Sequence, residues 1–298
     1  MKHNACIHII SSRTKCLFGS LSSFYEMFNN KHDYPVYVHY FDDIYDSKEY
    51  QDHVHEQISS NIKFISIPYK TPEHIKEEEL FQNRNDLWYS RTQFPPERKG
   101  YLHMCHFMSN FYGYPDTEFE QYDYAMSLDD ESIFVKEVPY DFFDVMENRP
   151  EDMGALKVLD QRKKPPHQGN FDTRVNLWSF IQDYLKKYNV EPKSEFLKNL
   201  LDDPNSEKNF HFYPVCDSYV IKLKMFETPE WKQWIDAVNE YGGIYKYRWG
   251  DNDINSLFYL IHYDHPVYDL KTVDEGYHNQ GGLRHLQDYA PGVKDYSR

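Results

Sequence analysis

Three short apolar runs in the first 70 residues constrain the fold of this chain most strongly. They are rich in β-branched residues, and they occupy 5–10, 36–41 and 62–67. Between the first two, the segment around Leu17 to Phe28 has the spacing of a helix. Strands that alternate with helices are typical of an α/β protein with a parallel sheet of nucleotide-binding type. The loop at 11–14 and the pair Asp42–Asp43 would then follow carboxyl ends of strands, where ligands bind.

A fourth apolar run, from Tyr122 to Leu128, ends in three consecutive acids, Asp129, Asp130 and Glu131. Carboxylates are ligands that Mn²⁺ and Mg²⁺ prefer. Alternate residues of an extended segment point the same way, so Asp129 and Glu131 are predicted to face one cation and Asp130 to point elsewhere. The alternative is a solvated acidic turn without a ligand.

The rest of the chain continues the alternation of helices and strands. Helices are predicted at 101–112, at 140–147, after Thr228 with Pro229 as first residue and Gly242–Gly243 as stop, and at about 252–261. Strands are predicted at 155–159 and 218–223, and the charged segment 161–173 is predicted to be a mobile loop.

Composition narrows the class of protein. The 298 residues carry 33 Lys and Arg against 48 Asp and Glu, and this formal charge of −15 argues against nucleic-acid binding. A phosphate-bearing ligand would need a cation as mediator. Without a linker or repeat, the chain is interpreted as one domain, 1–298, with a nucleotide-binding half at 1–135 and an acceptor-binding half at 136–298.

Neither the cysteines nor the apolar residues indicate a disulfide scaffold or a membrane protein. The four cysteines lack metal-site spacing, and Cys6 and Cys105 lie within apolar patterns that predict packed thiols. No apolar run approaches the length of a membrane span. We expect a cytoplasmic chain, with a Golgi luminal domain lacking its anchor as the alternative.

Two later segments are ambiguous by their chemistry alone. Arg248 to Asp253 precedes a predicted helix, so Asp251 or Asn252 could simply be its N-cap, and Arg248 a surface cation. His278 is one of 15 histidines and would not be singled out. The chain contains no P-loop, G-x-G-x-x-G, nucleophile elbow or H-E-x-x-H.

Taken in order, several segments resemble the fungal α-1,2-mannosyltransferases of the Kre2/Mnt1 type, glycosyltransferase family 15. The resemblance extends from the first strand to Gly276, and its most specific parts are Tyr-x-x-Met-Cys-x-Phe at 101–107, the acidic motif after the strand at 124–128, Arg-Trp-Gly-Asp at 248–251, and Gly-Tyr-His at 276–278.

This resemblance implies a GT-A fold, a single domain with a mixed, mostly parallel sheet flanked by helices. It also implies Mn²⁺ (or Mg²⁺), a nucleotide-sugar donor, GDP-mannose before a UDP-sugar, and transfer with retention. It places metal ligands at Asp129, Glu131 and His278. Arg13 matches an arginine near the nucleotide, and Tyr101 and Asp251 match positions of the donor and acceptor pocket. Arg248 and Asp42 complete the expected cofactor-binding residues.

The chain departs from the family pattern in two segments. The usual Glu-Pro-Asp is Asp129-Asp130-Glu131, and the glutamate proposed to face the anomeric carbon falls near Tyr219. The nearest acid is Asp217, and an offset of two residues in a strand preserves the face, so Asp217 is the expected replacement.

The leading hypothesis is therefore a metal-dependent glycosyltransferase that acts on a saccharide or glycoprotein glycan. The alternatives are a catalytically inactive glycan-binding relative and a metal-dependent phosphohydrolase.

Overall fold

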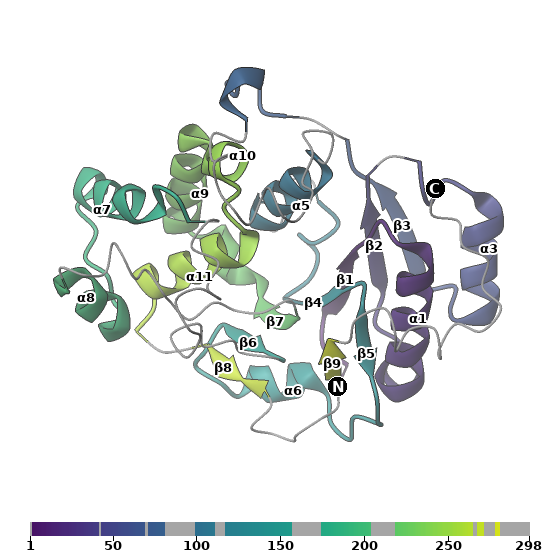
Figure 1. The fold of residues 1–298 in the computed structure, drawn as a ribbon. Coiled ribbons are helices and arrows are strands. Elements are labelled where there is room, and N and C mark those ends of the chain that lie inside the picture. The colour runs from purple at the N-terminus through teal and green to yellow at the C-terminus, as the bar shows by residue number, and fades with distance from the viewer. Residues whose placement is uncertain are drawn as a thin grey trace.

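A seven-stranded sheet, in the order β3-β2-β1-β4-β7-β6-β8, forms the centre of the described structure (Figure 1). The computed structural model describes residues 2–41, 43–68, 71–80, 99–110, 117–156, 174–203, 218–264, 267–270 and, for the backbone, 278–280. The strands are β1 Ala5–Ile10, β2 Val36–Tyr40, β3 Ile62–Ser66, β4 Tyr124–Asp129, β6 Met153–Ala155, β7 Tyr219–Lys222 and β8 Tyr268–Asp269. A separate pair joins β5 Ser132–Phe134 to β9 His278–Gln280.

The sheet is parallel on one side of β4 and mixed on the other. Strands β3, β2, β1 and β4 run parallel, whereas β7 runs antiparallel to both β4 and β6, and β6 pairs parallel with β8. The predicted mixed, mostly parallel sheet is therefore confirmed. Strand β4 lies where the parallel part of the sheet ends.

The two faces of the sheet belong to two different hydrophobic cores, because successive side chains of a strand point to opposite faces. In β1, Ile7 and Ile9 join one core and Cys6 joins the other; in β2, Val38 and Tyr37 divide the same way. All five side chains are buried. Such buried parallel strands are typical of sheets covered by helices on both faces.

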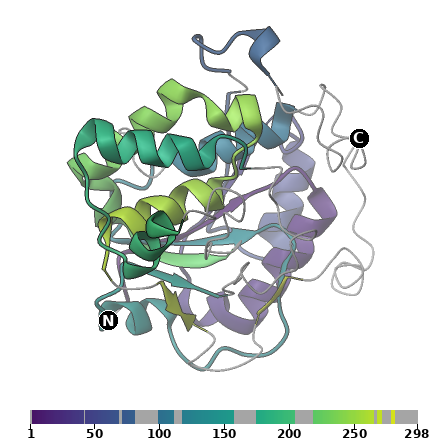
Figure 2. The same ribbon diagram turned by 60° about the vertical axis from the view of Figure 1, so that its left-hand side comes forward.

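Helices cover both faces (Figures 1 and 2). The core of Ile7 and Ile9 includes residues from α1 Thr14–Phe24, which continues as a π-helical turn at Tyr25–Asn29, and from α3 Lys48–Gln57 and α6 Phe142–Glu147. The other core includes residues from α5 Lys99–Asn110, α7 Leu177–Tyr188, α8 Glu195–Asp202, α9 Pro229–Tyr241, α10 Gly243–Tyr247 and α11 Asp251–His262. Short turns complete the described elements: α2 Asn30–His32, η2 Glu77–Glu79 and η7 Leu223–Glu227.

Helix α9 begins and ends as the sequence predicts. The Thr228 hydroxyl accepts a hydrogen bond from the Trp231 amide at 3.2 Å, and Pro229 is the first helical residue. At the other end Gly242 has φ +75°, a left-handed conformation that favours glycine.

Three predictions need correction or lie outside the described residues. The strand predicted at 155–159 overlaps β6, Met153–Ala155, only at Ala155, and residues 157–159 lie outside the described part of the chain. The N-cap of α11 is Gly250 rather than Asp251 or Asn252. The loop at 161–173 is not among the described residues.

Cys6 and Cys105 are buried and free, as predicted. Among the helices that the structure describes, none is both long and apolar enough to cross a membrane.

Candidate active site

The three consecutive acids lie at the carboxyl end of β4, beside the loop that follows β1. Asp129 is the last residue of β4 and pairs with Ile10, the last residue of β1. Asp130 and Glu131 form a turn that leads into β5, so the predicted extended geometry across all three acids is wrong. We call Asp129, Asp130 and Glu131 the acidic turn.

Arg13, the residue before α1, contacts all three carboxylates of the acidic turn. Its guanidinium bonds Asp130 through Nη2 and through Nε, the latter at 3.1 Å. Nη1 donates to Glu131 at 2.9 Å, and Nη2 lies 3.8 Å from Asp129. One cationic side chain therefore holds the acidic turn against the β1–α1 loop.

Burial lowers the pKa of Arg13, but the hydrogen bond and charge of Asp130 and the charge of Glu131 outweigh it, so the net pKa is raised. Ser11 adds a second anchor: its hydroxyl donates to Asp130 at 2.7 Å and lies 2.7 Å from the Tyr45 hydroxyl. Burial raises the pKa of Tyr45. Asp130 is thus fixed by neutral and cationic donors together.

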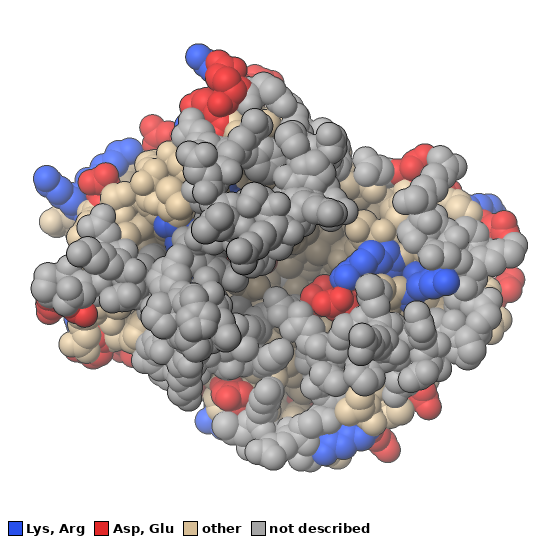
Figure 3. All heavy atoms as spheres, viewed as in Figure 1, with Lys and Arg blue, Asp and Glu red and all other residues tan. Residues whose placement is uncertain are grey.

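The acidic turn divides into one internal and two accessible carboxylates. The side chain of Asp130 is 3% exposed, whereas Asp129 is 29% and Glu131 25% exposed. Acidic and basic side chains lie together on the face of the molecule in Figure 3, over the region where β1, β4 and α1 meet in Figure 1. Asp129 and Glu131 are therefore open to a ligand, and their role in binding metal stays a prediction.

The strand that contains His278 lies directly beside the strand that follows the acidic turn. Strand β9 pairs antiparallel with β5, so the backbone of His278 faces Phe134 and that of Gln280 faces Ser132, the residue after Glu131. The side chain of His278 is outside the description. A segment nearly 150 residues away in sequence is thus brought next to the acidic turn.

Two other expected residues, Asp217 and Asp42, lie outside the described part of the chain. Beside Asp217, the hydroxyl of Ser218 lies 3.0 Å from that of Ser132. Tyr219, near which the family glutamate falls, is a buried strand residue.

A second cluster joins α5 to the segment between α10 and α11. The guanidinium of Arg248 lies over the ring of Tyr101, 4.4 Å from its centroid, and Arg248 has φ 63°. Asp251 is the first residue of α11. It hydrogen-bonds Cys105, whose pKa is raised by burial and then by the charge of Asp251. The structure therefore brings Tyr101 close to Arg248 and Asp251, although about 150 residues separate Tyr101 from the other two in the sequence.

The sequence-based interpretation missed the supporting residues of both clusters. Ser11 holds Asp130 and is itself in contact with the Tyr45 hydroxyl, and Cys105 was interpreted only as a packed thiol. Their positions in the sequence could have indicated both residues, because Ser11 directly follows the first strand and Cys105 is one helical turn from Tyr101. The four described tryptophans are buried and offer no exposed face to a sugar ring.

Comparison with solved structures defines the class of fold. The chain superposes on core-mannan synthase A from Aspergillus fumigatus, solved in an Mn/GDP form, with a TM-score of 0.74 and 19% identity, over 90% of this chain and 73% of that one. The fold is that of GT-A glycosyltransferases.

The family follows from the sequence match. Residues 1–280 match the model of the family described as glycolipid 2-alpha-mannosyltransferase, and the chain belongs to this family. It is 24% identical to the glycolipid 2-alpha-mannosyltransferase of Saccharomyces cerevisiae, over 99% of this chain and 70% of that protein. It is 26% identical to O-glycoside alpha-1,2-mannosyltransferase homolog 5 of Schizosaccharomyces pombe, over 81% of this chain and 61% of that protein.

Proposed function

We propose that this chain transfers mannose from GDP-mannose to a hydroxyl of a saccharide or glycan, forming an α-1,2 linkage with retention of configuration. The observation that carries the proposal is the acidic turn, placed at the carboxyl end of β4 in a chain whose residues 1–280 match this family. Both relatives bear names of α-mannosyltransferases, and the solved neighbour was obtained in an Mn/GDP form.

The donor set of the acidic turn suits a divalent cation. Asp129 and Glu131 offer accessible carboxylate oxygens, the ligand type that Mn²⁺ and Mg²⁺ prefer, and the backbone of His278 lies on the neighbouring strand. A cation bound there would neutralise the negative charge that develops on the leaving diphosphate. Asp129, Glu131 and His278 are the residues proposed to hold it.

Asp130 and Arg13 are proposed to position the acidic turn rather than to bind the cation. Asp130 is buried and bonded to Ser11 and Arg13, so it anchors the turn. Arg13 is 41% exposed, and its guanidinium, which is always cationic, is also proposed to contact a phosphate of the nucleotide. This location near both the acids and the open face supports the predicted role of Arg13.

Asp251 and Arg248 are proposed to orient the sugar that reacts. Asp251 lies in the first turn of α11, where its backbone is fixed, and Arg248 is held over the Tyr101 ring. Asp217 is proposed to stabilise positive charge at the anomeric carbon, in place of the family glutamate. Its test is Asp217→Asn, which should lower kcat and leave donor binding unchanged.

The proposal is tested by transfer from labelled GDP-mannose to an α-mannoside, with and without Mn²⁺. We expect Asp129→Asn to lower transfer by at least about 100-fold because a ligand to the cation is lost. Asp123→Asn, at the opposite end of β4, is the matched control and should be as active as the unmodified chain. Full activity of Asp129→Asn would contradict the proposed metal ligand.

Two further measurements separate this activity from the alternatives. An active transferase should be thermally stabilised by GDP together with Mn²⁺, whereas a glycan-binding relative should be stabilised by glycan alone. A phosphohydrolase would release phosphate without any acceptor. The anomeric proton of the product, observed by NMR, reports whether configuration is retained.

A further inference from the structure

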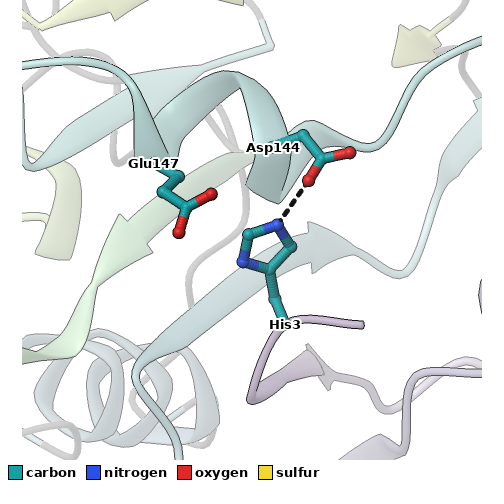
Figure 4. Close-up of side chains that lie close together, drawn as sticks. All are labelled: His3, Asp144 and Glu147. Carbon is teal, nitrogen blue, oxygen red and sulfur yellow. Dashed lines mark hydrogen bonds and ion pairs between the residues drawn. The ribbon is translucent and has the colours of Figure 1, made fainter. Parts of the chain in front are cut away.

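A second group of side chains of metal-ligating types lies near the amino ends of the central strands, opposite the acidic turn. His3 precedes β1 by two residues, and Asp144 and Glu147 belong to α6 (Figure 4). One ring nitrogen of His3 and one carboxylate oxygen from each acid all lie within 4.8 Å of one another. Strands β1 and β4 run parallel, so this group lies at their amino ends, about 17 Å along β4 from the acidic turn.

The two carboxylates share one face of α6. Asp144 and Glu147 are three residues apart, a spacing that places side chains side by side on a helix. Both are exposed, and neither forms an ion pair with Lys or Arg within the described residues. The neighbouring cations have other partners: Lys2 bonds the carbonyl of Asp33, and Arg149 bonds the Tyr268 hydroxyl at 2.6 Å.

The imidazole of His3 is held in place by Asp144 and by the aromatic rings of Tyr124 and Phe143. Its side chain is only 9% exposed, with Nε2 lying 2.6 Å from Oδ1 of Asp144. The ring of Tyr124 packs edge-on at 5.6 Å and that of Phe143 lies at 6.3 Å. No hydrogen bond within the described residues reaches Nδ1, and Figure 4 shows this nitrogen on the side of the ring nearer Glu147.

The backbone that carries His3 is fixed as well. The carbonyl of Asn4 accepts hydrogen bonds from the amides of Asp123 at 2.8 Å and Tyr124 at 3.3 Å. Burial, followed by the charge of Glu147, raises the pKa of the Tyr124 hydroxyl, so Glu147 also acts on the residue that orients the ring. A preorganised imidazole is therefore presented to two carboxylates.

We propose that His3, Asp144 and Glu147 form a binding site for a first-row divalent cation such as Zn²⁺, which links the segment before β1 to α6. One imidazole and two carboxylates are a set of three protein ligands that zinc accepts, with water at the fourth position. Two adjacent carboxylates carry two negative charges, and a protonated His3 would compensate only one of them. A divalent cation balances both and leaves His3 neutral.

This site is independent of the proposed transferase activity, and its test uses binding rather than catalysis. The full chain is stripped with a chelator and titrated with Zn²⁺ by calorimetry, in an Asp129→Asn/Glu131→Gln background that removes the acidic turn as a competing site. We expect one equivalent of Zn²⁺ to bind, and a higher melting temperature in its presence. His3→Gln and Glu147→Gln should each weaken binding by at least about 10-fold.

Asp123→Asn is the matched control, because Asp123 is an exposed acid next to Tyr124 but outside the cluster. It should bind Zn²⁺ as the background chain does. Glu147 is exposed, so its substitution should not disturb folding, and transfer in the presence of Mn²⁺ should be unchanged in His3→Gln.

Diffraction from crystals soaked in Zn²⁺ gives the position directly, as an anomalous peak between His3 and Glu147. Failure of the background chain to bind Zn²⁺, or binding by His3→Gln and Glu147→Gln as tight as that of the background chain, would show that His3 and Asp144 form an ordinary ion pair and would overturn the proposal.

Discussion

At the scale of single residues, the acidic turn combines one buried acid with two accessible ones. The side chain of Asp130 is 3% exposed and depends on Arg13 and Ser11, whereas those of Asp129 and Glu131 are 29% and 25% exposed. A buried carboxylate is tolerated only when it is paired or hydrogen-bonded. Arg13 therefore stabilises the turn as well as facing the open side of the site.

Arg13→Ala should destabilise the protein by about 1–3 kcal/mol, because it leaves the buried Asp130 without its cation. The estimate is at the modest end for an ion pair because Arg13 is 41% exposed and solvent screens it. Urea unfolding measures the change in the free energy of unfolding.

Asp130→Asn provides the control for this prediction. Removing the charge removes the need for Arg13, so Arg13→Ala should cost less in the Asp130→Asn background than alone. Equal costs in the two backgrounds would contradict the role of Arg13 as the partner of Asp130.

At the scale of elements, the junction of α9, α10 and α11 presents Arg248 and Asp251 to α5. Trp249, which lies between them, is fully buried, and its indole Nε1 donates to the carbonyl of Val175 at 2.8 Å. A Cβ on Gly243 would approach the Trp249 ring to 2.2 Å. Close packing of Gly243 on Trp249 thus sets where the α10–α11 segment lies.

Gly243→Ala should therefore lower both stability and transfer. The overpacked site should cost roughly 1–3 kcal/mol, and the displaced Trp249 should shift its neighbours Arg248 and Asp251. Thermal unfolding and the KM for acceptor measure the two effects. Gly250→Ala is the matched control: its nearest contact would be 3.8 Å away and its φ of −80° suits alanine, so it should change both quantities little.

At the scale of the whole molecule, the buried His8 and His39 and the half-buried His106 and His262 favour the neutral form. Burial, and then the charge of His39, lowers the pKa of His8; burial also lowers the pKa of His39. Burial lowers the pKa of His106 and of His262 to about 4. The unfolded chain, with histidine pKa values of about 6.5, therefore binds more protons than the folded one in mildly acidic solution.

Stability should accordingly fall as the pH decreases from about 6.5 to 4, because the proton-rich unfolded state is favoured there. Above about pH 6.5 these histidines should contribute no pH dependence. Melting temperatures measured across this range test the expectation. His262→Gln should flatten the slope, and an unchanged slope in that variant would show that His262 does not contribute.

Much of the fold could be predicted from local patterns. The β-branched runs at 5–10, 36–41 and 62–67 became β1, β2 and β3, and the Thr228–Pro229 start and Gly242 stop of α9 were confirmed. These features depend on neighbouring residues alone. The start of β6 at Met153, two residues before the predicted strand, is set by pairing with β7, which is more than 60 residues later.

In the candidate site, too, some features follow from neighbouring residues and others from contacts between distant segments. The order of residues determined that three acids follow a buried strand and that Tyr101 lies one helical turn from Cys105. Only the tertiary structure decided which acid is buried, because that depends on Arg13 and Ser11, over 100 residues earlier. It also placed β9 beside β5, and His3 beside Asp144 and Glu147, because hydrogen-bonded strands and packed helices join segments that local spacing cannot relate.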